Sequence, residues 1–176
     1  CPRCSTVLSN HELNLGGYKD VHDPAITVRF KVNGAPDALL KKDKELLNGT
    51  TYLLAWTTTP WTLPSNLGLT MGSDVDYVKV KDGDDFYILA QARLGAYYKN
   101  ADEYTIVWTK KGKDLLGLEY EPLFPYFSSL KRNEDGSDGA FRVFNADFVT
   151  TEDGTGIVHT APGFGEDDNK VFKGTG

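Results

Sequence analysis

The chain has 176 residues, of which 40% are hydrophobic, 12% aromatic and 25% charged. This composition suffices for one globular domain with a single core and excludes a globally disordered chain. Its 19 Lys and Arg against 25 Asp and Glu give a net charge of −6, which disfavours binding to duplex nucleic acid, because duplex binders carry a basic face. A nucleic-acid partner would therefore be a single-stranded end. The longest apolar run, residues 52–56, is far shorter than the roughly 20 residues that span a bilayer, so we expect a soluble chain without membrane contact. We further expect it to be cytoplasmic and monomeric.

The first motif in chain order is Cys1-Pro2-Arg3-Cys4, which contains both cysteines of the sequence. Two thiolates at this spacing supply half of the ligands of a tetrahedral zinc ion, and no second Cys-x-x-Cys follows. We therefore expect a fragment of a longer protein, in which Cys1 and Cys4 form half of a structural zinc site that is empty in the fragment. The alternative is a free or oxidised pair, because half a site binds metal poorly.

Alternation of apolar and polar residues dominates the rest of the chain. Residues 26–32 alternate with a period of two, which predicts a strand with one buried face. Residues 51–58 are β-branched and aromatic, which predicts a more deeply buried strand. Further strands are predicted at residues 75–81, 86–90, 104–109, 141–144 and 156–160, with a hairpin turn at residues 82–84.

Helical signals are few. One or two turns are predicted within residues 35–47, a short helix within residues 92–99, and a helix over residues 166–172 with acidic residues in its first turn. Residues 128–139 are rich in Asn, Asp, Ser and Gly towards their end, which predicts a surface loop. Many short strands with few helices indicate a mainly β fold, and we predict a β-barrel with a few short peripheral helices.

Residues 56–66 differ from ordinary barrel sequence, since they read Trp56-Thr57-Thr58-Thr59-Pro60-Trp61-Thr62-Leu63-Pro64-Ser65-Asn66. The two prolines lock φ and remove two backbone donors just after the buried strand. Successive threonine hydroxyls donate and accept hydrogen bonds, which suits a ribose, a carbonyl group or a water molecule. The alternative is that a threonine-rich strand end merely favours β geometry.

The second unusual segment covers residues 153–168. Glycines including Gly156 bracket a strand and permit close approach of a ligand to the backbone. The strand delivers His159 to a loop, and the loop leads into a helix that carries Asp167 and Asp168, so a histidine and a carboxylate can face one pocket. The alternatives are that His159 is a hydrogen-bonded core histidine and that Asp167 or Asp168 caps the helix.

Together the two segments resemble the editing insertion of isoleucyl-tRNA synthetases. The resemblance covers nearly the whole chain, including the leading Cys-Pro-x-Cys. Valyl and leucyl relatives share the Thr-Thr-x-Pro and Gly-Thr-Gly core, but they typically carry Arg-Pro-Glu-Thr or Arg-Pro-Asp-Thr where this chain has Thr59-Pro60-Trp61-Thr62. They also lack a histidine at the position of His159, so the resemblance favours the isoleucyl branch.

The resemblance implies one editing domain over residues 1–176 within an ATP-dependent isoleucine–tRNA ligase. The implied activity is that of an aminoacyl-tRNA deacylase, which hydrolyses the ester of valine attached to tRNA(Ile), with valyl-adenylate as a second substrate. The implied partners are the 3′ end of the mischarged tRNA, its valine, and the rest of the synthetase in cis. No cofactor is implied in the editing site, and structural zinc at Cys1 and Cys4 belongs to the longer enzyme.

The resemblance also implies roles for single residues. The catalytic set is Thr57, Thr58, Thr59, His159 and Asp168. The substrate-binding set is Trp56, Trp61, Asn66, Gly156 and Asp167. Asp168 matches the acidic position that binds the α-ammonium group, with Asp167 as the alternative at that position. His159 limits the side-chain pocket, so that isoleucine is excluded. The threonines position the terminal adenosine, the ester and the attacking water.

Two other functions stay open on the sequence alone. One is a degenerate, non-catalytic barrel that binds the tRNA 3′ end or serves as a structural module, and the complete set of threonines, His159 and Asp168 argues against it. The other is an editing domain of the valyl type, against which His159 and Trp61 argue.

Overall fold

The computed structural model describes residues 5, 7, 24–43, 46–132 and 139–173. Within them the strands are β1 (Ile26–Gly34), β2 (Thr51–Thr57), β3 (Gly68–Met71), β4 (Asp76–Asp82), β5 (Asp85–Ala90), β6 (Thr105–Lys111), β7 (Glu119–Tyr120), β8 (Arg142–Asn145) and β9 (Ile157–Thr160). The α-helices are α2 (Asp37–Lys42), α3 (Leu94–Tyr97) and α4 (Glu166–Lys173), and the 3₁₀ helices are η1 (Pro60–Ser65), η2 (Gln91–Arg93), η3 (Gly112–Leu115) and η4 (Pro125–Lys131). Cys1 and Cys4 lie outside the described residues, so the zinc half-site stays a prediction.

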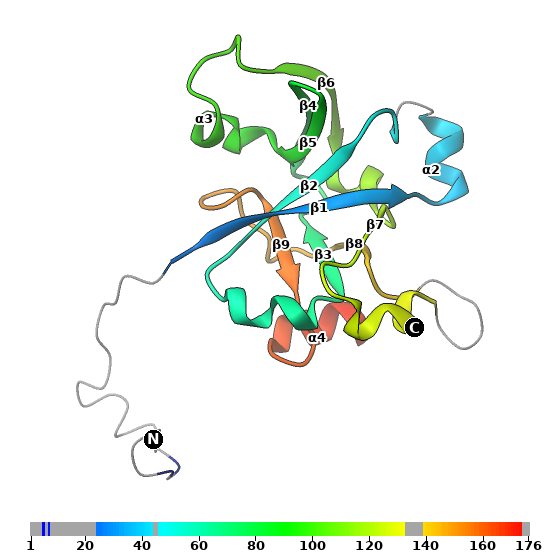
Figure 1. Ribbon diagram of the computed structural model, residues 1–176, viewed down its shortest axis with the longest axis vertical. Coiled ribbons are helices and arrows are strands. Elements are labelled where there is room, and N and C mark those ends of the chain that lie inside the picture. Colours follow the sequence, from blue (N-terminus) through cyan, green and yellow to red (C-terminus); the bar gives the residue numbers. More distant parts are fainter. Residues whose placement is uncertain (1–4, 6, 8–23, 44–45, 133–138, 174–176) are drawn as a thin grey trace.

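Six strands close into a barrel in the order β1-β7-β8-β3-β9-β2, because β2 also pairs with β1. The closing pair is antiparallel and long, with Phe30 opposite Leu53. The other edge of β2 is shared: its first half pairs in parallel with β5, and Trp56 near its end pairs with Val158 of β9. Strands β5, β4 and β6 therefore branch from the barrel as a second layer (Figure 1).

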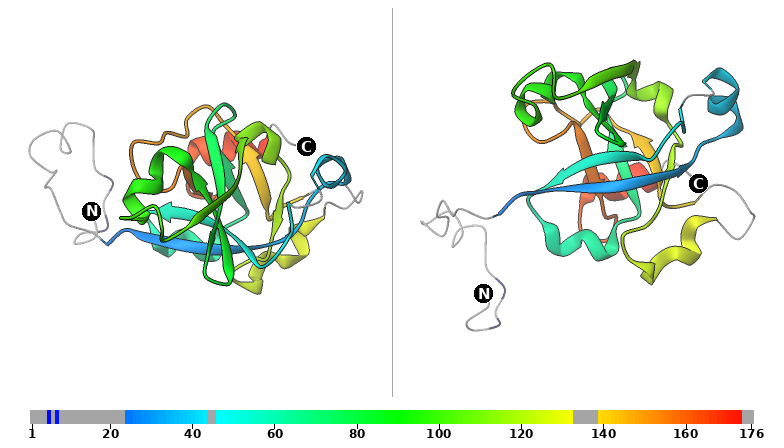
Figure 2. Two further views of the ribbon diagram at one scale, coloured as in Figure 1. Left: turned by 90° about the horizontal axis from the view of Figure 1, so that it is seen from above. Right: turned by 45° about the horizontal axis from the view of Figure 1, so that its top comes forward.

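Two apolar clusters hold this arrangement together. The larger fills the barrel and includes Phe30, Leu53 and Tyr120, all fully buried. The smaller lies under the branch and contains Val78, Leu89 and their neighbours. Burial of each such side chain stabilises the fold by about 1.5–3 kcal/mol. In Figure 1 the branch lies at the top, with η1 and α4 at the bottom, and the right view of Figure 2 again shows the branch apart from η1.

The mainly β fold with a barrel and short peripheral helices is confirmed. All seven predicted strands form, with ends displaced by one or two residues, and Gly83 provides the positive φ of the turn between β4 and β5. Two strands were not predicted: β3 is buried on both faces and so lacks alternation, and β7 is only 2 residues long. Part of the predicted loop over residues 128–139 is wrong, because residues 128–131 continue η4, which begins at Pro125.

No helix in the described part of the chain is both long and apolar enough to cross a membrane.

Candidate active site

The threonine-rich segment forms a tight 3₁₀ turn where β2 leaves the barrel wall. Thr59 N donates to Thr57 Oγ1 at 3.0 Å, which bends the chain directly after the strand. Thr62 Oγ1 donates to the carbonyl oxygen of Thr59 at 2.8 Å, and Pro60 stands at the first helical position, where its missing donor costs nothing. The sequence therefore places Thr59 and Thr62 on one short, rigid element.

His159 comes from β9, the strand that enters the barrel after Gly154 and Gly156. Both glycines have positive φ, and a Cβ on Gly156 would lie 2.5 Å from the Cβ of Ala90. In β9 His159 lies opposite Leu69 of β3 and is 7% exposed. The chain then turns through residues 161–165 into α4, which brings three acidic residues back towards the end of β9.

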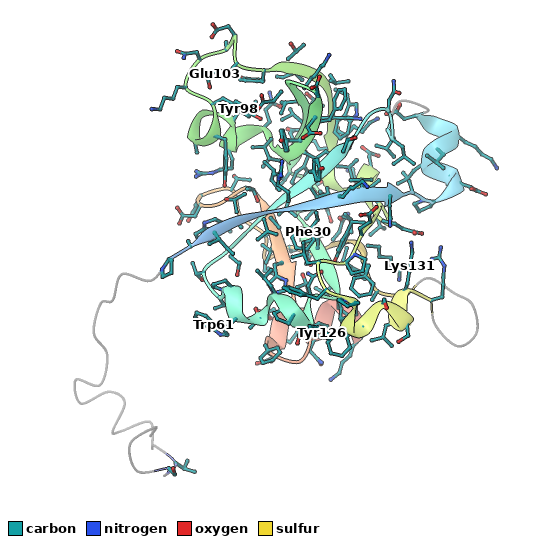
Figure 3. All side chains as sticks on the ribbon, viewed as in Figure 1. Phe30, Trp61, Tyr98, Glu103, Tyr126 and Lys131 are labelled. Atoms are coloured by element: carbon teal, nitrogen blue, oxygen red, sulfur yellow. The ribbon has the colours of Figure 1, made fainter. Side chains whose placement is uncertain are left out.

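The two segments meet at one pocket of about 290 Å³ at the end of the barrel. Its lining residues come from η1 and its preceding turn, from β9, and from the loop and first turn of α4: Thr59, Trp61, Thr62, His159, Ala161, Phe164, Gly165 and Asp168. Trp61 and Phe164 are 67% and 68% exposed and so present open aromatic surface beside it. Figure 3 shows Trp61 projecting from η1 at this end of the molecule.

Both ring nitrogens of His159 are hydrogen-bonded inside the protein. Nε2 lies 2.9 Å from Thr62 Oγ1, and Nδ1 lies 2.8 Å from Asn66 Nδ2. Burial lowers the pKa of His159 below its ordinary value of 6.5, against the opposing effect of the Asp168 carboxylate. The imidazole at the pocket is therefore neutral at pH 7, and its nitrogens are engaged with side chains.

The structure places the two adjacent aspartates of α4 differently. Asp168 lines the pocket, is half-buried, and accepts a hydrogen bond at Oδ2 from the backbone N–H of Ala161 at 2.8 Å. Among the described residues no hydrogen bond reaches its other oxygen, Oδ1. Asp167 instead lines a separate cavity and pairs with Lys170 at 3.2 Å. Of the two, only Asp168 shares a pocket with His159.

The other predicted site residues lie at varying distances from the pocket. Thr57 is buried beneath it, with its Oγ1 3.3 Å from Thr59 Oγ1, and Asn66 is buried against His159. Thr58 is exposed and is not among the lining residues.

Trp56 and Gly156 lie away from the pocket. The Trp56 ring fills the space where Gly154 would carry a side chain, and the carbonyl of Gly156 accepts the Tyr77 hydroxyl at 2.5 Å. These glycines therefore serve packing in this structure.

Four lining residues were not singled out from the sequence: Thr62, Ala161, Phe164 and Gly165. All four lie inside the two segments that the sequence distinguishes, residues 56–66 and 153–168, so the sequence was sufficient to identify the segments. It was not sufficient to identify these four residues, because the geometry of the turns decides which side chains face the pocket.

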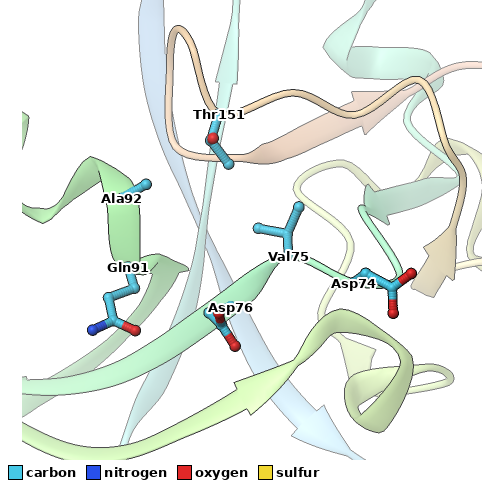
Figure 4. Close-up of a pocket in the computed structure, with 6 residues that line it drawn as sticks. All are labelled: Asp74, Val75, Asp76, Gln91, Ala92 and Thr151. Carbon is cyan, nitrogen blue, oxygen red and sulfur yellow. The ribbon is translucent and has the colours of Figure 1, made fainter.

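Other cavities offer weaker chemistry. A cavity of about 410 Å³ is lined by residues of β4, of η2 and of the loops before β4 and β9: Asp74, Val75, Asp76, Gln91, Ala92 and Thr151 (Figure 4). Its two carboxylates are already paired, Asp74 with Lys113 at 3.0 Å and Asp76 with Lys111 at 2.8 Å. Across the residues that the structure describes, no group of three or more His, Cys, Asp or Glu could hold a metal ion.

The fold is that of editing domains from the aminoacyl-tRNA synthetases. A structure of GlLeuRS-CP1 superposes with a TM-score of 0.67 at 20% identity, over 85% of this chain and 59% of that one. The P. knowlesi cytosolic leucyl-tRNA synthetase editing domain superposes with a TM-score of 0.60 at 16% identity, over 82% of this chain and 59% of that one. No protein-family model matches the chain.

Sequence relatives narrow the assignment. The chain is 63% identical, over an alignment of 190 positions, to the isoleucine–tRNA ligase of Treponema denticola, of which it covers 17%. It is 50% identical to the isoleucine–tRNA ligase of Treponema pallidum (strain Nichols), an alignment that covers the whole chain and 17% of the relative. It is 47% identical to the isoleucine–tRNA ligase of Clostridium tetani, an alignment that covers 98% of the chain and 14% of the relative. The chain therefore spans about a sixth of the length of these curated relatives. Its sequence is similar to one region of the isoleucine–tRNA ligases, and its fold is that of the synthetase editing domains.

Proposed function

We propose that this domain hydrolyses the ester bond of valine mistakenly attached to tRNA(Ile). The observation that carries the proposal is the single pocket in which Asp168 of α4, His159 of β9 and Thr59, just before η1, meet. Its relatives are isoleucine–tRNA ligases, which supports an isoleucyl over a valyl assignment.

The need for such a pocket follows from the size of the substrate difference. One methylene separates isoleucine from valine and is worth only about 1–3 kcal/mol of binding, isoleucyl synthetases being the standard example of this limit. A second, smaller site that admits valine and excludes isoleucine raises the accuracy. A volume of about 290 Å³ lies at the lower end for small-ligand pockets, which suits the aminoacyl end of a larger molecule.

Asp168 supplies the anchor for the substrate's α-ammonium group. Its Oδ2 is fixed by the N–H of Ala161, and Oδ1 carries a lone pair for a charge-assisted hydrogen bond. Holding the ammonium group at this point orients the ester carbonyl relative to Thr59 and His159. Orientation of this kind accounts for a large part of catalysis when the reaction itself is easy.

Hydrolysis of the ester then needs a positioned water rather than a strong base. The water oxygen adds to the ester carbonyl carbon, the carbon–oxygen bond to the ribose breaks, and the ribose oxygen takes up a proton. The hydroxyl of Thr59, which donates or accepts as required, lies at the pocket beside that of Thr57. His159 acts as a wall, since both of its nitrogens are already hydrogen-bonded.

The test is deacylation of Val-tRNA(Ile) and Ile-tRNA(Ile) by the full-length ligase carrying Asp168→Ala or Asp167→Ala. Asp168→Ala is expected to reduce valine release at least 100-fold, because the substrate loses its ionic anchor. Asp167→Ala is the matched control, since its carboxylate faces Lys170 and a different cavity, and it is expected to retain full activity. Equal losses in the two variants, or equal release of valine and isoleucine by the unchanged ligase, would overturn the proposal.

Two predictions from the sequence remain: a non-catalytic binding module, and valyl-adenylate as a second substrate. The deacylation assay, together with a binding measurement, addresses both. A barrel that binds a non-hydrolysable valyl-adenosine analogue without releasing valine would be a binding module. Valyl-adenylate as a second substrate is tested by replacing the tRNA ester with the adenylate in the same pair of variants.

A further inference from the structure

A chain of hydrogen bonds runs from the barrel core to His159, and its direction is determined at each step. Asn66 Nδ2 donates to the backbone oxygen of Gly68 at 2.8 Å, which identifies it as the amide nitrogen. The hydroxyl of Tyr120 donates to Asn66 Oδ1 at 2.7 Å. The second hydrogen of Nδ2 is therefore the one that reaches His159 Nδ1 at 2.8 Å.

The protonation state of the ring follows. Nδ1 accepts a hydrogen bond from an amide that has only hydrogens to offer, so Nδ1 carries no proton. In the neutral ring the proton is then on Nε2, which donates to Thr62 Oγ1 at 2.9 Å. The hydrogen of Thr62 is itself used on the oxygen of Thr59 at 2.8 Å, so the chain ends consistently.

Tyr120 is well placed to hold this chain, although it does not line the pocket. It is fully buried in the barrel, with its ring edge-on to Phe30 at 5.2 Å and to Phe141 at 6.2 Å between ring centroids. Reversal of the Asn66 amide would set Asn66 Oδ1 against the oxygen of Gly68. It would also turn Nδ2 towards Tyr120, so that the buried Tyr120 hydroxyl hydrogen would lose its acceptor. Both contacts therefore oppose reversal.

We propose that Tyr120 is a positioning residue for the editing pocket: acting through Asn66, it fixes His159 as the neutral tautomer protonated on Nε2. Protonation of Nδ1 would require the amide to turn away, so the chain also keeps the ring uncharged beside Asp168, the charged group that faces it from α4. The proposal about the ring stands on these contacts alone. Its consequence, a fixed wall that separates valine from isoleucine, rests on the proposed function.

The ring state is tested by nitrogen NMR of the chain with ¹⁵N-labelled histidine. The chain has 3 histidines, and His159→Gln assigns the signals of the third. The unchanged chain is expected to show one tautomer at pH 7.5, with a proton on Nε2 only. In Tyr120→Phe the opposite tautomer becomes visible and the titration midpoint of His159 rises by up to about one pH unit, since one hydrogen bond fewer opposes reversal of the amide.

Tyr77→Phe is the matched control. Tyr77 is equally buried, and its hydroxyl joins Gly72 N to Gly156 O without contacting Asn66. It is expected to lower the free energy of unfolding while leaving the tautomer and the midpoint of His159 unchanged. A wild-type tautomer and midpoint in Tyr120→Phe, or two tautomers already in the unchanged chain, would overturn the proposal.

An activity measurement separates this proposal from the proposed function. In the full-length ligase, Tyr120→Phe is expected to narrow the preference for Val-tRNA(Ile) over Ile-tRNA(Ile) several-fold, and Tyr77→Phe to preserve it. An unaltered preference in Tyr120→Phe would contradict the fixed-wall consequence. If the unchanged ligase releases neither amino acid, the proposed function fails, and the NMR result still decides the state of the ring.

Discussion

At the scale of single residues, His159 illustrates how burial and hydrogen bonding decide what a titratable side chain does. A histidine in a hydrolytic site is usually considered first as a general base. Here Asn66 and Thr62 occupy both nitrogens, and burial favours the uncharged form. In the function proposed above, the side chain therefore contributes shape, and the ionic contact with substrate is assigned to Asp168.

The depressed pKa of His159 predicts how stability varies with pH. The folded protein holds the ring neutral, so the unfolded chain binds the proton more readily, near pH 6.5. The neutral ring's contribution is complete above pH 6.5 and is lost as the pH falls from there towards the lower folded value. We expect the stability advantage of the unchanged chain over His159→Gln to narrow between pH 7.5 and pH 5, as measured by urea unfolding.

His11 and His22 provide the internal control for that measurement, because both proteins contain them and their titration cancels in the difference. An advantage that stays constant or widens as the pH falls would show that His159 is not held neutral by the fold.

At the scale of elements, patterns that depend on neighbours in sequence were predictable and patterns that depend on partners in space were not. The alternation in β1 and the β-branched run of β2 were sufficient to place both strands. Strand β3 was missed because all of its side chains are buried, on both faces of the sheet, which removes the alternation of apolar and polar residues.

The same distinction holds for the site. Asp168, His159 and Thr59 lie in motifs that the sequence displays, and the structure brings them to one pocket. Tyr120 lies 54 positions from the Asn66 that it contacts, in a strand of only 2 residues, and no local pattern marks it. Its place depends on the pairing of β7 with β1, in which Tyr120 lies opposite Val32.

The glycines before β9 give a prediction at this scale. Gly156→Ala places a Cβ 2.5 Å from the Cβ of Ala90, at a backbone φ of +73°. The close contact and the left-handed backbone both destabilise the folded variant. We expect a loss of about 2–5 kcal/mol in the free energy of unfolding, from the left-handed backbone and from overpacking. Gly163→Ala is the control in the loop after β9, where a Cβ meets nothing within 4 Å, and it should change stability by less than about 0.5 kcal/mol.

Denaturant unfolding of the two alanine variants makes the comparison. Similar stabilities would mean that the loop before β9 adjusts freely, and the packing role assigned to Gly156 would be wrong.

At the scale of the whole molecule, the core consists of a larger cluster in the barrel and a smaller cluster under the branch. The barrel cluster reaches the site through Phe30, which packs on Tyr120 at 5.2 Å, and Tyr120 bonds Asn66. The branch cluster around Val78 and Leu89 has no such link among the described contacts. Coupling to the site should therefore depend on which cluster is disturbed, and not on stability alone.

Two cavity-forming variants test this division. Phe30→Ala is expected to cost about 3–5 kcal/mol and Leu89→Ala about 2–5 kcal/mol, because both side chains are fully buried. Only Phe30→Ala is expected to shift the ring signals of His159, because it loosens Tyr120 and the amide that Tyr120 holds. Substitutions in clusters without shared partners act independently, so equal shifts of His159 in the two variants would show that barrel and branch respond as one body. The expected result is that Leu89→Ala destabilises the chain while the His159 signals stay unchanged. The branch would then contribute to the stability of the fold without setting the geometry of the pocket.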